Sequence, residues 1–262
     1  MSSKPMVTAA QLAGIVRAKP GSKHLAQIHD LIPALNKTLL KYEIDTPLRI
    51  AHFLAQIAHE SMGLRRTIEI WPRPNLDRNG VARNGNRFQL RYEKMKRNLG
   101  NYRPGDGYRF RGRGLIQLTG RYNYTAYGKA LGRDLVSGNN MEAVGLLPLA
   151  IDVAGWFWTS RRVNLNALAD GDHFIRIMRA INGGENGRED RRRYLIRAKR
   201  VLGITGLQAG GKKTYTVRPG DFLSRIAATY GISLKKLKAA NPEIKGPDFI
   251  IEPGQKIKIP GK

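Results

Sequence analysis

Carboxylates are the side chains of this sequence best suited to chemistry, and Glu60 is the first candidate. It follows the segment TPLRIAHFLAQIAH, in which apolar residues recur at helical spacing. Thr46 suits the N-cap and Pro47 suits the first helical position, so Glu60 falls in the last turn of the predicted helix. Carbonyl dipoles at a helix C-terminus and partial burial both favour the protonated form that a general acid needs. Taken alone, the segment also fits a solvated glutamate at a helix end.

Other kinds of reactive site find less support. The chain has no cysteine, which excludes disulfides and thiolate metal sites. His52 and His59 have neither the i, i+4 spacing nor the HExxH pattern of a zinc site, and no GxSxG elbow or phosphate-binding loop is present. We therefore expect no metal and no cofactor, and acid/base chemistry by two carboxylates. Candidates for the second carboxylate are Glu69, Glu93, Asp77 and Asp106.

The elements that must position these groups are mostly helices. Apolar periodicity predicts helices over residues 7–17, 24–42, 46–61, 124–131, 142–160, 172–181 and 187–202. Residues 62–113 are rich in Gly, Asn, Pro and Arg, which indicates long loops with short elements, and long structured loops are usually functional. The aromatic cluster Trp156 to Trp158 is interpreted as core. The first domain, residues 1–204, is thus predicted to be mainly α.

The C-terminal part has a different pattern. Residues 205–213, TGLQAGGKK, indicate a flexible linker. Residues 214–262 then form a second small domain, with a strand over 214–217, a helix capped by Asp221, a helix capped by Ser233 and a closing strand over 256–259. This order predicts a β-α-α-β unit.

The net charge of +26 indicates an anionic partner, because such an excess destabilises a compact chain through self-repulsion. The positive charge is spread over both predicted domains, which argues against a single basic tail. The N-terminal segment lacks an apolar core of signal-peptide length, and no run is long enough to span a bilayer.

Three blocks carry a resemblance to a known family. FLAQIAHES, YRFRGRGLIQLTGRYNY and INGGENGRED resemble signature blocks of the family 19 glycoside hydrolases, which include plant-type chitinases and a branch of phage endolysins. The blocks occur in the family's order over roughly residues 7–203, and HES followed by RYE is closer to the endolysin branch. The resemblance implies a mainly α, lysozyme/chitinase-like catalytic domain with long loops.

The resemblance also implies roles for residues. Glu60 matches the general acid, and Glu69 is the expected base, with Glu93 as runner-up because the plant enzymes place theirs nearer the GRG block. Thr119 matches a residue that helps to hold the attacking water. The expected sugar-binding residues are Gln117, Tyr122, Asn123 and Asn182, with Trp71 and Tyr108 as apolar platforms.

Two of these residues also fit a structural role, and two of the glutamates are expected to interact with nearby arginines. Gln117 and Asn182 also fit the satisfaction of buried backbone groups. Glu69 lies in an arginine-rich setting, which favours its charged form and suits a base. The arginines of that setting are Arg65, Arg66 and Arg73. Glu185 is expected to form a supporting charge network with Arg188 or Arg191.

The stretch YTVRPGDFLSRIAATYGISLKKLKAANPEI resembles a LysM module, a family that binds glycans containing N-acetylglucosamine. Its small core is expected from Tyr215, Ile226 and Tyr230. Its glycan-binding residues are expected to be Gly220, Asp221, Phe222, Asn241 and Pro242.

Together the resemblances imply a monomeric endolysin. It would hydrolyse β-1,4 bonds of peptidoglycan glycan strands by an inverting two-carboxylate mechanism. It would bind anionic cell-wall or outer-membrane surfaces and no specific nucleic acid. It would stay in the host cytoplasm until a membrane lesion releases it to the periplasm and wall. The alternatives are a chitinase and, from another class, a non-catalytic basic protein that binds cell wall or nucleic acid.

Overall fold

The computed structural model describes residues 6–72, 75–85, 87–160, 162–204, 213–217, 221–230, 232–244 and 250–260. The chain divides into two compact units, Met1–Gly203 and Ile204–Lys262. The first unit is helical, and the second contains a two-stranded antiparallel sheet with two helices. The predicted linker residues 205–212 lie outside the described residues, and β1 (Lys213–Thr216) follows them.

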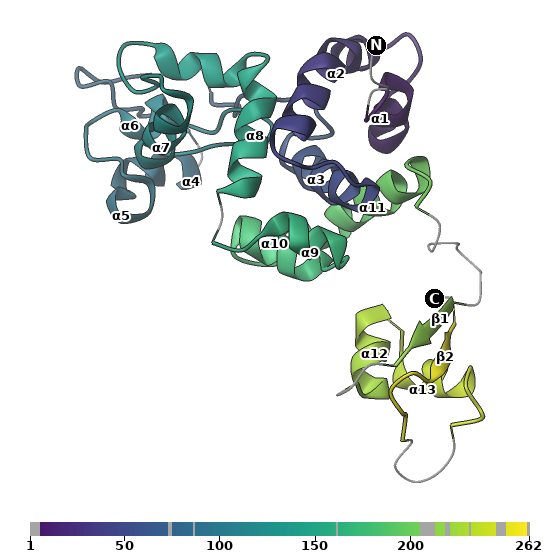
Figure 1. The fold of residues 1–262 in the computed structure, drawn as a ribbon. Coiled ribbons are helices and arrows are strands. Elements are labelled where there is room, and N and C mark those ends of the chain that lie inside the picture. Colours follow the sequence, from purple (N-terminus) through teal and green to yellow (C-terminus); the bar gives the residue numbers. More distant parts are fainter. Residues whose placement is uncertain are drawn as a thin grey trace. The chain divides into compact units, whose positions relative to one another are not determined.

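The first unit is built from short and medium-length helices. Figure 1 shows two groups, α4 to α7 on one side of α8, and α1 to α3 with α11 on the other. The helices are α1 (Ala9–Val16), α2 (Lys23–Lys41), α3 (Pro47–Glu60), α4 (Arg87–Arg91), η1 (Tyr92–Lys94), α5 (Lys96–Leu99), α6 (Asp106–Arg109), α7 (Arg121–Leu131), η2 (Asn140–Gly145), α8 (Leu149–Thr159), α9 (Leu165–Asp170), α10 (Phe174–Asn182) and α11 (Arg188–Val201).

Helix α3 is the central element of this unit, and its boundaries confirm the prediction from the sequence. Thr46 caps its N-terminus by accepting a hydrogen bond from the Arg49 amide at 3.2 Å, and Pro47 begins the helix. Every residue from Ile50 to Ala58 is buried. Helix α11 packs along α3, and α1 packs on α11, so Glu60 ends a helix that its neighbours hold rigidly.

The predicted helix over residues 142–160 was wrong in extent. The structure has a 3₁₀ turn, η2, followed by α8, which begins directly after Pro148. Proline has no amide hydrogen to donate inside a helix, so the helix starts after it. Trp158 is 2% exposed and meets Phe53 edge to face at 5.6 Å between ring centroids, as the core interpretation requires.

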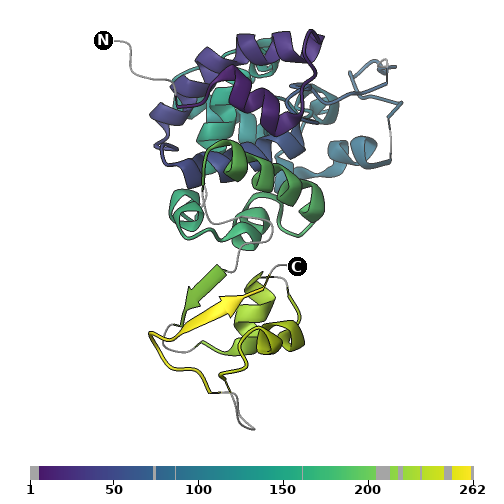
Figure 2. The ribbon, with the colours of Figure 1, turned by 90° about the vertical axis from the view of Figure 1, so that its right-hand side faces the viewer.

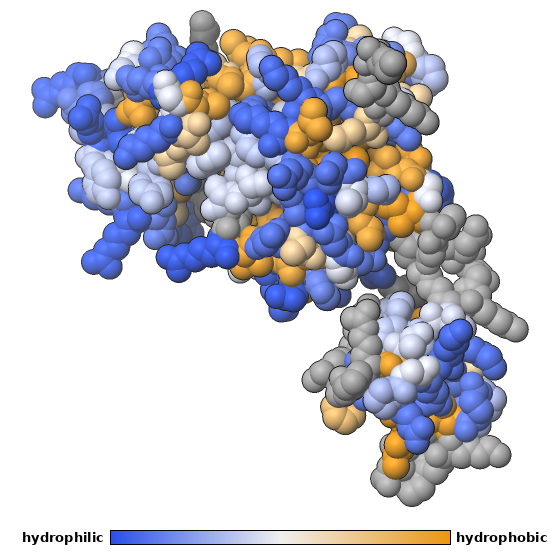
Figure 3. All heavy atoms as spheres, viewed as in Figure 1, coloured by the Kyte–Doolittle hydropathy of each residue, from blue (hydrophilic) through white to orange (hydrophobic). Residues whose placement is uncertain are grey.

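Residues 62–113 form loops and four short helical segments, as their composition indicated. In Figure 3 hydrophilic side chains predominate over the α4 to α7 side of the unit. A buried arginine, Arg113, forms hydrogen bonds that fix the loop before α7. Arg113 is fully buried, and its guanidinium donates to the Arg109 carbonyl at 2.8 Å and to the Tyr124 hydroxyl at 3.0 Å. Glu142 forms an ion pair with it.

The second unit has its own small core. β1 pairs antiparallel with β2 (Lys256–Ile259), in the register Thr214 to Lys258 and Thr216 to Lys256. Figure 2 shows the two strands side by side, with α12 (Leu223–Tyr230) and α13 (Leu234–Ala239) to one side of the sheet. The buried residues are Val217, Leu223, Ile226, Ala227, Leu237, Ile244, Ile257 and Ile259.

Candidate active site

The carboxylate of Glu60 is held by a buried guanidinium. Arg191 of α11 is 2% exposed, and its Nη2 donates a hydrogen bond to Oε1 of Glu60. Its Nη1 donates to Oε1 of Gln56 at 2.6 Å, and its Nε donates to the Asn186 carbonyl at 3.3 Å. Gln56 lies one turn before Glu60 on α3, so the same helix that carries the carboxylate also fixes its partner. This buried positive charge lies beside Glu60 in addition to the helix dipole and the burial expected from the sequence.

A second pair fixes the end of α3 to the start of α11. Nδ1 of His59 lies 2.8 Å from Oδ2 of Asp190. Gly187, at the N-cap of α11, has a φ of +72°, and a Cβ there would lie 2.2 Å from the His59 ring. Both the conformation and the close approach require glycine at this position. Adjacent residues of α3 thus bind adjacent residues of α11.

The turn that follows Glu60 is unusually tight. Met62, Gly63 and Leu64 have φ values of +54°, +75° and +67°. Two of the three carry side chains in a left-handed conformation, which costs of order 1–3 kcal/mol each and is frequent at functional sites. Ser61 stabilises the turn, because its hydroxyl accepts the Leu64 amide at 3.0 Å and its carbonyl accepts the Arg65 amide at 3.0 Å.

Glu69 lies on an extended segment that pairs with the loop around Gly112. The Gly114 amide donates to the Thr67 carbonyl at 2.7 Å, and the Glu69 amide donates to the Gly112 carbonyl at 2.8 Å. Ile68 and Arg113 form an antiparallel bridge between these hydrogen bonds. The backbone of Glu69 is therefore fixed to the same loop that leads into α7.

Neutral groups orient the Glu69 carboxylate. The Gly112 amide donates to Oε2 at 3.1 Å, and the Gln89 side-chain amide donates to Oε1 at 3.2 Å and to the Ile70 carbonyl at 2.8 Å. None of the described arginines forms an ion pair with Glu69, and the expected effect of the arginine-rich setting on its charge stays a prediction. The tight turn directs Arg65 toward Tyr194 instead, while Arg73 lies outside the described residues.

Three other expected residues are connected to this carboxylate. A Cβ on Gly112 would lie 2.6 Å from Oε1 of Gln117, so the Gln117 side chain lies against Gly112. The Thr119 hydroxyl donates to the Gln117 carbonyl at 2.8 Å, and the Asn123 side-chain amide donates to the Thr119 carbonyl at 2.7 Å. Gln117 thus lies against the glycine whose amide binds Glu69, and Thr119 and Asn123 follow it along the loop into α7. The Thr119 oxygen keeps lone pairs that can accept a hydrogen bond from a water.

Glu93, the runner-up base, is bound to a helix start. Its Oε1 accepts the Tyr108 amide at 3.3 Å, at the beginning of α6. Burial raises the pKa of Glu93, and backbone hydrogen bonds from Gly107, Tyr108 and Gly105 only partly oppose this effect. Because the Glu93 carboxylate accepts a backbone hydrogen bond at the start of α6, the geometry favours Glu69 over Glu93 as the base.

The aromatic positions differ in accessibility. Trp71 is half-buried, its Nε1 donates to the Asn84 carbonyl at 2.7 Å, and its ring meets Tyr108 edge to face at 5.3 Å. Arg111 lies over the Tyr108 ring at 4.3 Å. Tyr122 on α7 is 68% exposed and is therefore the most accessible of the three rings.

Asn182 is used within the loop between α10 and α11. Its side-chain amide donates to the Asn186 carbonyl at 3.2 Å, and its Oδ1 accepts the Gly184 amide at 2.9 Å. These bonds agree with the alternative in which Asn182 satisfies backbone groups.

Glu185 pairs with Arg188 at 2.8 Å and also with Arg179, whereas Arg191 pairs with Glu60.

The residues expected to bind glycan in the second unit include exposed residues and residues whose side chains are bonded within the unit. Phe222 is 62% exposed and Pro242 is also exposed, so both face solvent. Asp221 accepts a hydrogen bond from the Tyr215 hydroxyl at 2.5 Å. Gly220 lies outside the described residues.

Asn241 is the exception among them. It is 1% exposed, and its side-chain amide donates to the Leu237 carbonyl at 2.8 Å and the Lys258 carbonyl at 2.7 Å. Its Oδ1 accepts the Lys258 amide at 2.5 Å. Because both amide hydrogens are used to join α13 to β2, this arrangement favours a structural role for Asn241.

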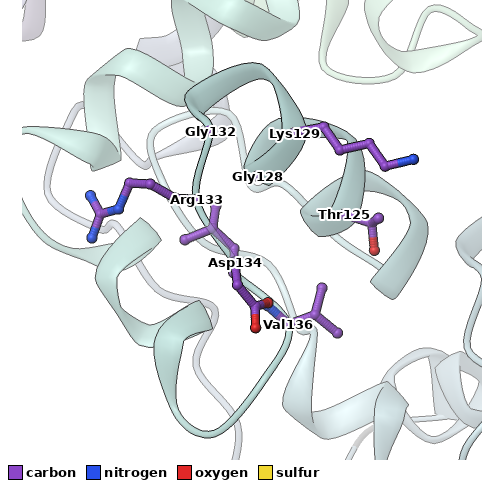
Figure 4. Close-up of a pocket in the computed structure, with 8 residues that line it drawn as sticks. Thr125, Gly128, Lys129, Gly132, Arg133, Asp134 and Val136 are labelled. Carbon is purple, nitrogen blue, oxygen red and sulfur yellow. The ribbon is translucent and has the colours of Figure 1, made fainter.

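A hollow of about 330 Å³ lies elsewhere in the first unit, at the C-terminal end of α7. Figure 4 shows Lys129 on the helix and Asp134 and Val136 on the loop that follows it. None of the expected site residues lines this hollow, and Oδ1 of Asp134 accepts the Val136 amide at 2.7 Å. Its chemistry gives no reason to prefer it over the carboxylates.

Two further searches concern the described ranges only. No group of three His, Asp or Glu side chains there is arranged to hold a metal ion. Nor does any described helix combine the length and the apolar character needed to cross a membrane.

Sequence reasoning missed three residues that hold the carboxylates. Gln56 had a signal, because it precedes Glu60 by one helical turn and lies on an otherwise apolar face. Arg191 was considered only as a partner of Glu185. Gln89 gave no signal, since its position beside Glu69 depends on how the long loop folds back.

Comparisons with known proteins agree with this architecture. The family described as chitinase class I matches residues 43–170, and the LysM domain family matches residues 215–260. A solved chitinase C from Streptomyces griseus superposes with a TM-score of 0.55 at 22% identity, covering 77% of this chain and 95% of that one. At this identity the likeness shows the fold alone.

Two curated relatives match stretches of different length. A region of 53 residues is 45% identical to an N-acetylmuramoyl-L-alanine amidase of Staphylococcus epidermidis, covering 20% of this chain and 15% of the amidase. A glycosyl hydrolase family 19 domain-containing protein of Haemophilus influenzae is 33% identical over 155 residues, covering 54% of this chain and 74% of the relative. The chain therefore belongs to glycoside hydrolase family 19, as a chitinase-like enzyme with a C-terminal LysM domain.

Proposed function

We propose that this enzyme is an endolysin that hydrolyses β-1,4-glycosidic bonds in the glycan strands of bacterial peptidoglycan. The observation that carries the proposal is the pair of half-buried carboxylates, Glu60 and Glu69, each oriented by its own hydrogen-bond partners in a unit joined to a LysM domain. The LysM domain supports peptidoglycan as the polymer, as does the likeness of 53 residues of the chain to an N-acetylmuramoyl-L-alanine amidase. The net charge of +26 suits an anionic wall.

Glu60 acts in this mechanism as the general acid. It gives its proton to the glycosidic oxygen as the bond to the anomeric carbon breaks. Arg191 fixes the direction of the carboxylate, because its bonds to Gln56 and Asn186 leave it little freedom. The proton returns to Glu60 from solvent after the product leaves.

Glu69 acts as the general base on the opposite face of the sugar. It takes a proton from the water that attacks the anomeric carbon, and the configuration at that carbon is inverted. Both oxygens of the carboxylate accept hydrogen bonds, as an ionised carboxylate does. The Thr119 oxygen holds the attacking water without titrating. Inversion requires the two carboxyl groups to be roughly 6.5–9.5 Å apart, so that a water fits between sugar and base.

The LysM domain is proposed to hold the catalytic unit on its polymer. Tethering raises the local concentration of glycan bonds without adding catalytic contacts. In the proposed setting the protein accumulates in the host cytoplasm, reaches the wall after a separate membrane lesion and lyses the cell.

The test is digestion of purified Gram-negative peptidoglycan by the wild type and by Glu60→Gln, followed by mass spectrometry of borohydride-reduced fragments. We expect the wild type to release glycan fragments, and the folded variant to release them about 10²–10⁴ times more slowly. The reduced sugar at the new end names the bond that is cut. Equal release by both proteins would remove Glu60 from the mechanism.

A chitinase is the second candidate function, because the chitinase class I family matches residues 43–170. Chitin oligosaccharides digested in parallel separate the two. Rapid cleavage of chitin with no release from peptidoglycan would favour the chitinase. A second assay, of cells that express the protein with and without a membrane-permeabilising agent, tests the lytic role, and we expect lysis only with the agent.

A further inference from the structure

Four arginines gather beside the turn that follows Glu60. Helix α11 contributes two of them, the C-terminus of α1 contributes one, and the turn itself contributes the fourth. Figures 1 and 2 both show α1 lying alongside α11. We call this set the arginine cluster, and it consists of Arg17, Arg65, Arg193 and Arg197.

Tyr194 is the centre of the arginine cluster. The guanidinium of Arg197 lies 4.6 Å from the centroid of the Tyr194 ring, and its Nε donates to the Ile15 carbonyl at 2.6 Å. A Cβ built on Gly63 would lie 3.2 Å from the Tyr194 hydroxyl and 3.6 Å from Nη1 of Arg65. Arg197 therefore lies over the Tyr194 ring, Arg65 lies near the Tyr194 hydroxyl, and glycine at 63 leaves the space for this approach.

The cluster arginines have no ion-pair partner in the part of the chain that the structure describes, although the charge of Asp190 acts on Arg197. None of the four forms an ion pair with a carboxylate among the described residues, and the nearby Asp190 is bonded to His59. Burial lowers the pKa of Arg197, and the charges of Arg17 and Arg193 lower it further. The charges of Tyr194 and Asp190 only partly oppose this shift. Like charges so close together repel each other, and a bound anion would remove this repulsion.

The cluster is close to the proposed acid. Arg191, which holds Glu60, and Arg197 lie on the same helix, six residues apart, or roughly 9 Å along the axis at 1.5 Å per residue. Arg65 lies in the turn that joins Glu60 to Glu69. An anion bound by the cluster would therefore be reached from the sugar beside the scissile bond by a stem of several residues, at roughly 3.3–3.6 Å per extended residue.

We propose that the arginine cluster binds free carboxylates of the peptide stem of peptidoglycan and so selects stem-bearing strands over neutral glycans. The stem is attached to the muramic sugar beside the scissile bond, and it carries free carboxylates within its first few residues. Chitin has no such anions. Arginine suits the role, because its planar fork donates two parallel hydrogen bonds to a carboxylate. This inference rests on the proposed action on peptidoglycan.

The test compares two forms of one substrate. Glycan strands with intact stems and the same strands stripped by an amidase are digested by the wild type and by the double variant Arg65→Gln/Arg193→Gln. Both substituted side chains are exposed and unpaired among the described residues, so the fold is expected to persist, which circular dichroism checks. The measured quantity is the ratio of kcat/KM for intact strands to kcat/KM for stripped strands.

We expect the double variant to lower this ratio about five- to twentyfold, since each exposed pair contributes up to about 1 kcal/mol and two are removed. Raising the salt concentration should lower the wild-type ratio in the same direction. The matched control is Arg176→Gln/Arg200→Gln, which removes the same charge from exposed positions outside the cluster and is expected to keep the ratio within twofold.

Two results would overturn the inference while the proposed function stands: a ratio unchanged in the cluster variant, or an equal fall in the control variant. A wild type that cleaves chitin oligosaccharides but neither form of peptidoglycan would instead overturn the proposed function, and the inference with it. The two failures are therefore distinguishable.

Discussion

The two carboxylates of the site are held in opposite ways. Glu60 ends a buried helix and is bound by a charged, buried partner, whereas Glu69 lies on an extended segment and is bound by an amide side chain and a backbone N–H. The first arrangement is set by helix packing between α3 and α11, and the second by a long loop that folds back on itself. The proposed acid is therefore oriented by a charged group, and the proposed base by the geometry of a loop.

The sharpest test of this comparison is the identity of the base. Glu69→Gln should lower kcat by about 10²–10⁴-fold, because the amide cannot take a proton from the attacking water. Glu93→Gln, the matched change at the runner-up position, should keep kcat within about threefold, because Glu93 serves the start of α6. Steady-state rates on peptidoglycan fragments measure both. A larger loss in Glu93→Gln would reverse the assignment.

The next test compares the two holding groups. Arg191→Lys keeps the charge but loses the fork that reaches both Gln56 and Glu60, and we expect kcat to fall about 10- to 100-fold. Gln89→Leu removes a neutral donor from Glu69 and should cost about 3- to 10-fold. Rates are compared after confirming that both variants melt cooperatively. Equal losses in the two variants would remove the distinction between charged and neutral support.

The role of the loop that holds Glu69 can be tested by replacing its glycines with alanine. Gly112→Ala places a Cβ 2.6 Å from the flexible end of Gln117, so we expect kcat/KM to fall about 3- to 10-fold with a change in unfolding free energy below about 1 kcal/mol.

The matched control, Gly114→Ala, places a Cβ 2.4 Å from the buried Val153 at a φ of +74°. It should lose about 1–3 kcal/mol of stability. Chemical denaturation measures both changes, and a stable Gly114→Ala variant would contradict the packing argument.

The difference between the helix that carries Glu60 and the loop that carries Glu69 also explains what could be predicted from the sequence. The boundaries of α3, the position of Glu60 and the β-α-α-β order of the second unit follow from periodicity and caps, which act over a few residues. The expected 142–160 helix was wrong because the pattern of apolar residues outweighed Pro148 in the prediction.

Loop contacts could not be predicted in this way. Arg65 lies beside Tyr194 because of the backbone turn at Met62, Gly63 and Leu64. Gln89 lies beside Glu69 because the long loop folds back, and no local pattern encodes either contact. The same holds for Asn241, which was expected to bind glycan and instead joins α13 to β2. An Asn-Pro pair in a sequence does not reveal whether the side-chain amide of the Asn is hydrogen-bonded to a later strand.

The smallest expected effect concerns stability at the rejected base. Burial raises the pKa of Glu93 above its ordinary value of 4.5, so the folded state holds the proton more tightly than the unfolded state. Between these two pKa values the native protein binds more protons, and its stability therefore falls as the pH rises. Glu93→Gln removes this loss while keeping an oxygen that can accept the Tyr108 amide. The melting temperature of the variant minus that of the wild type should accordingly become more positive from pH 4 to pH 8, by about a few degrees at most. A difference that becomes more negative with rising pH would mean that the ionised carboxylate stabilises α6, and Glu93 would regain its standing as a carboxylate available to the chemistry.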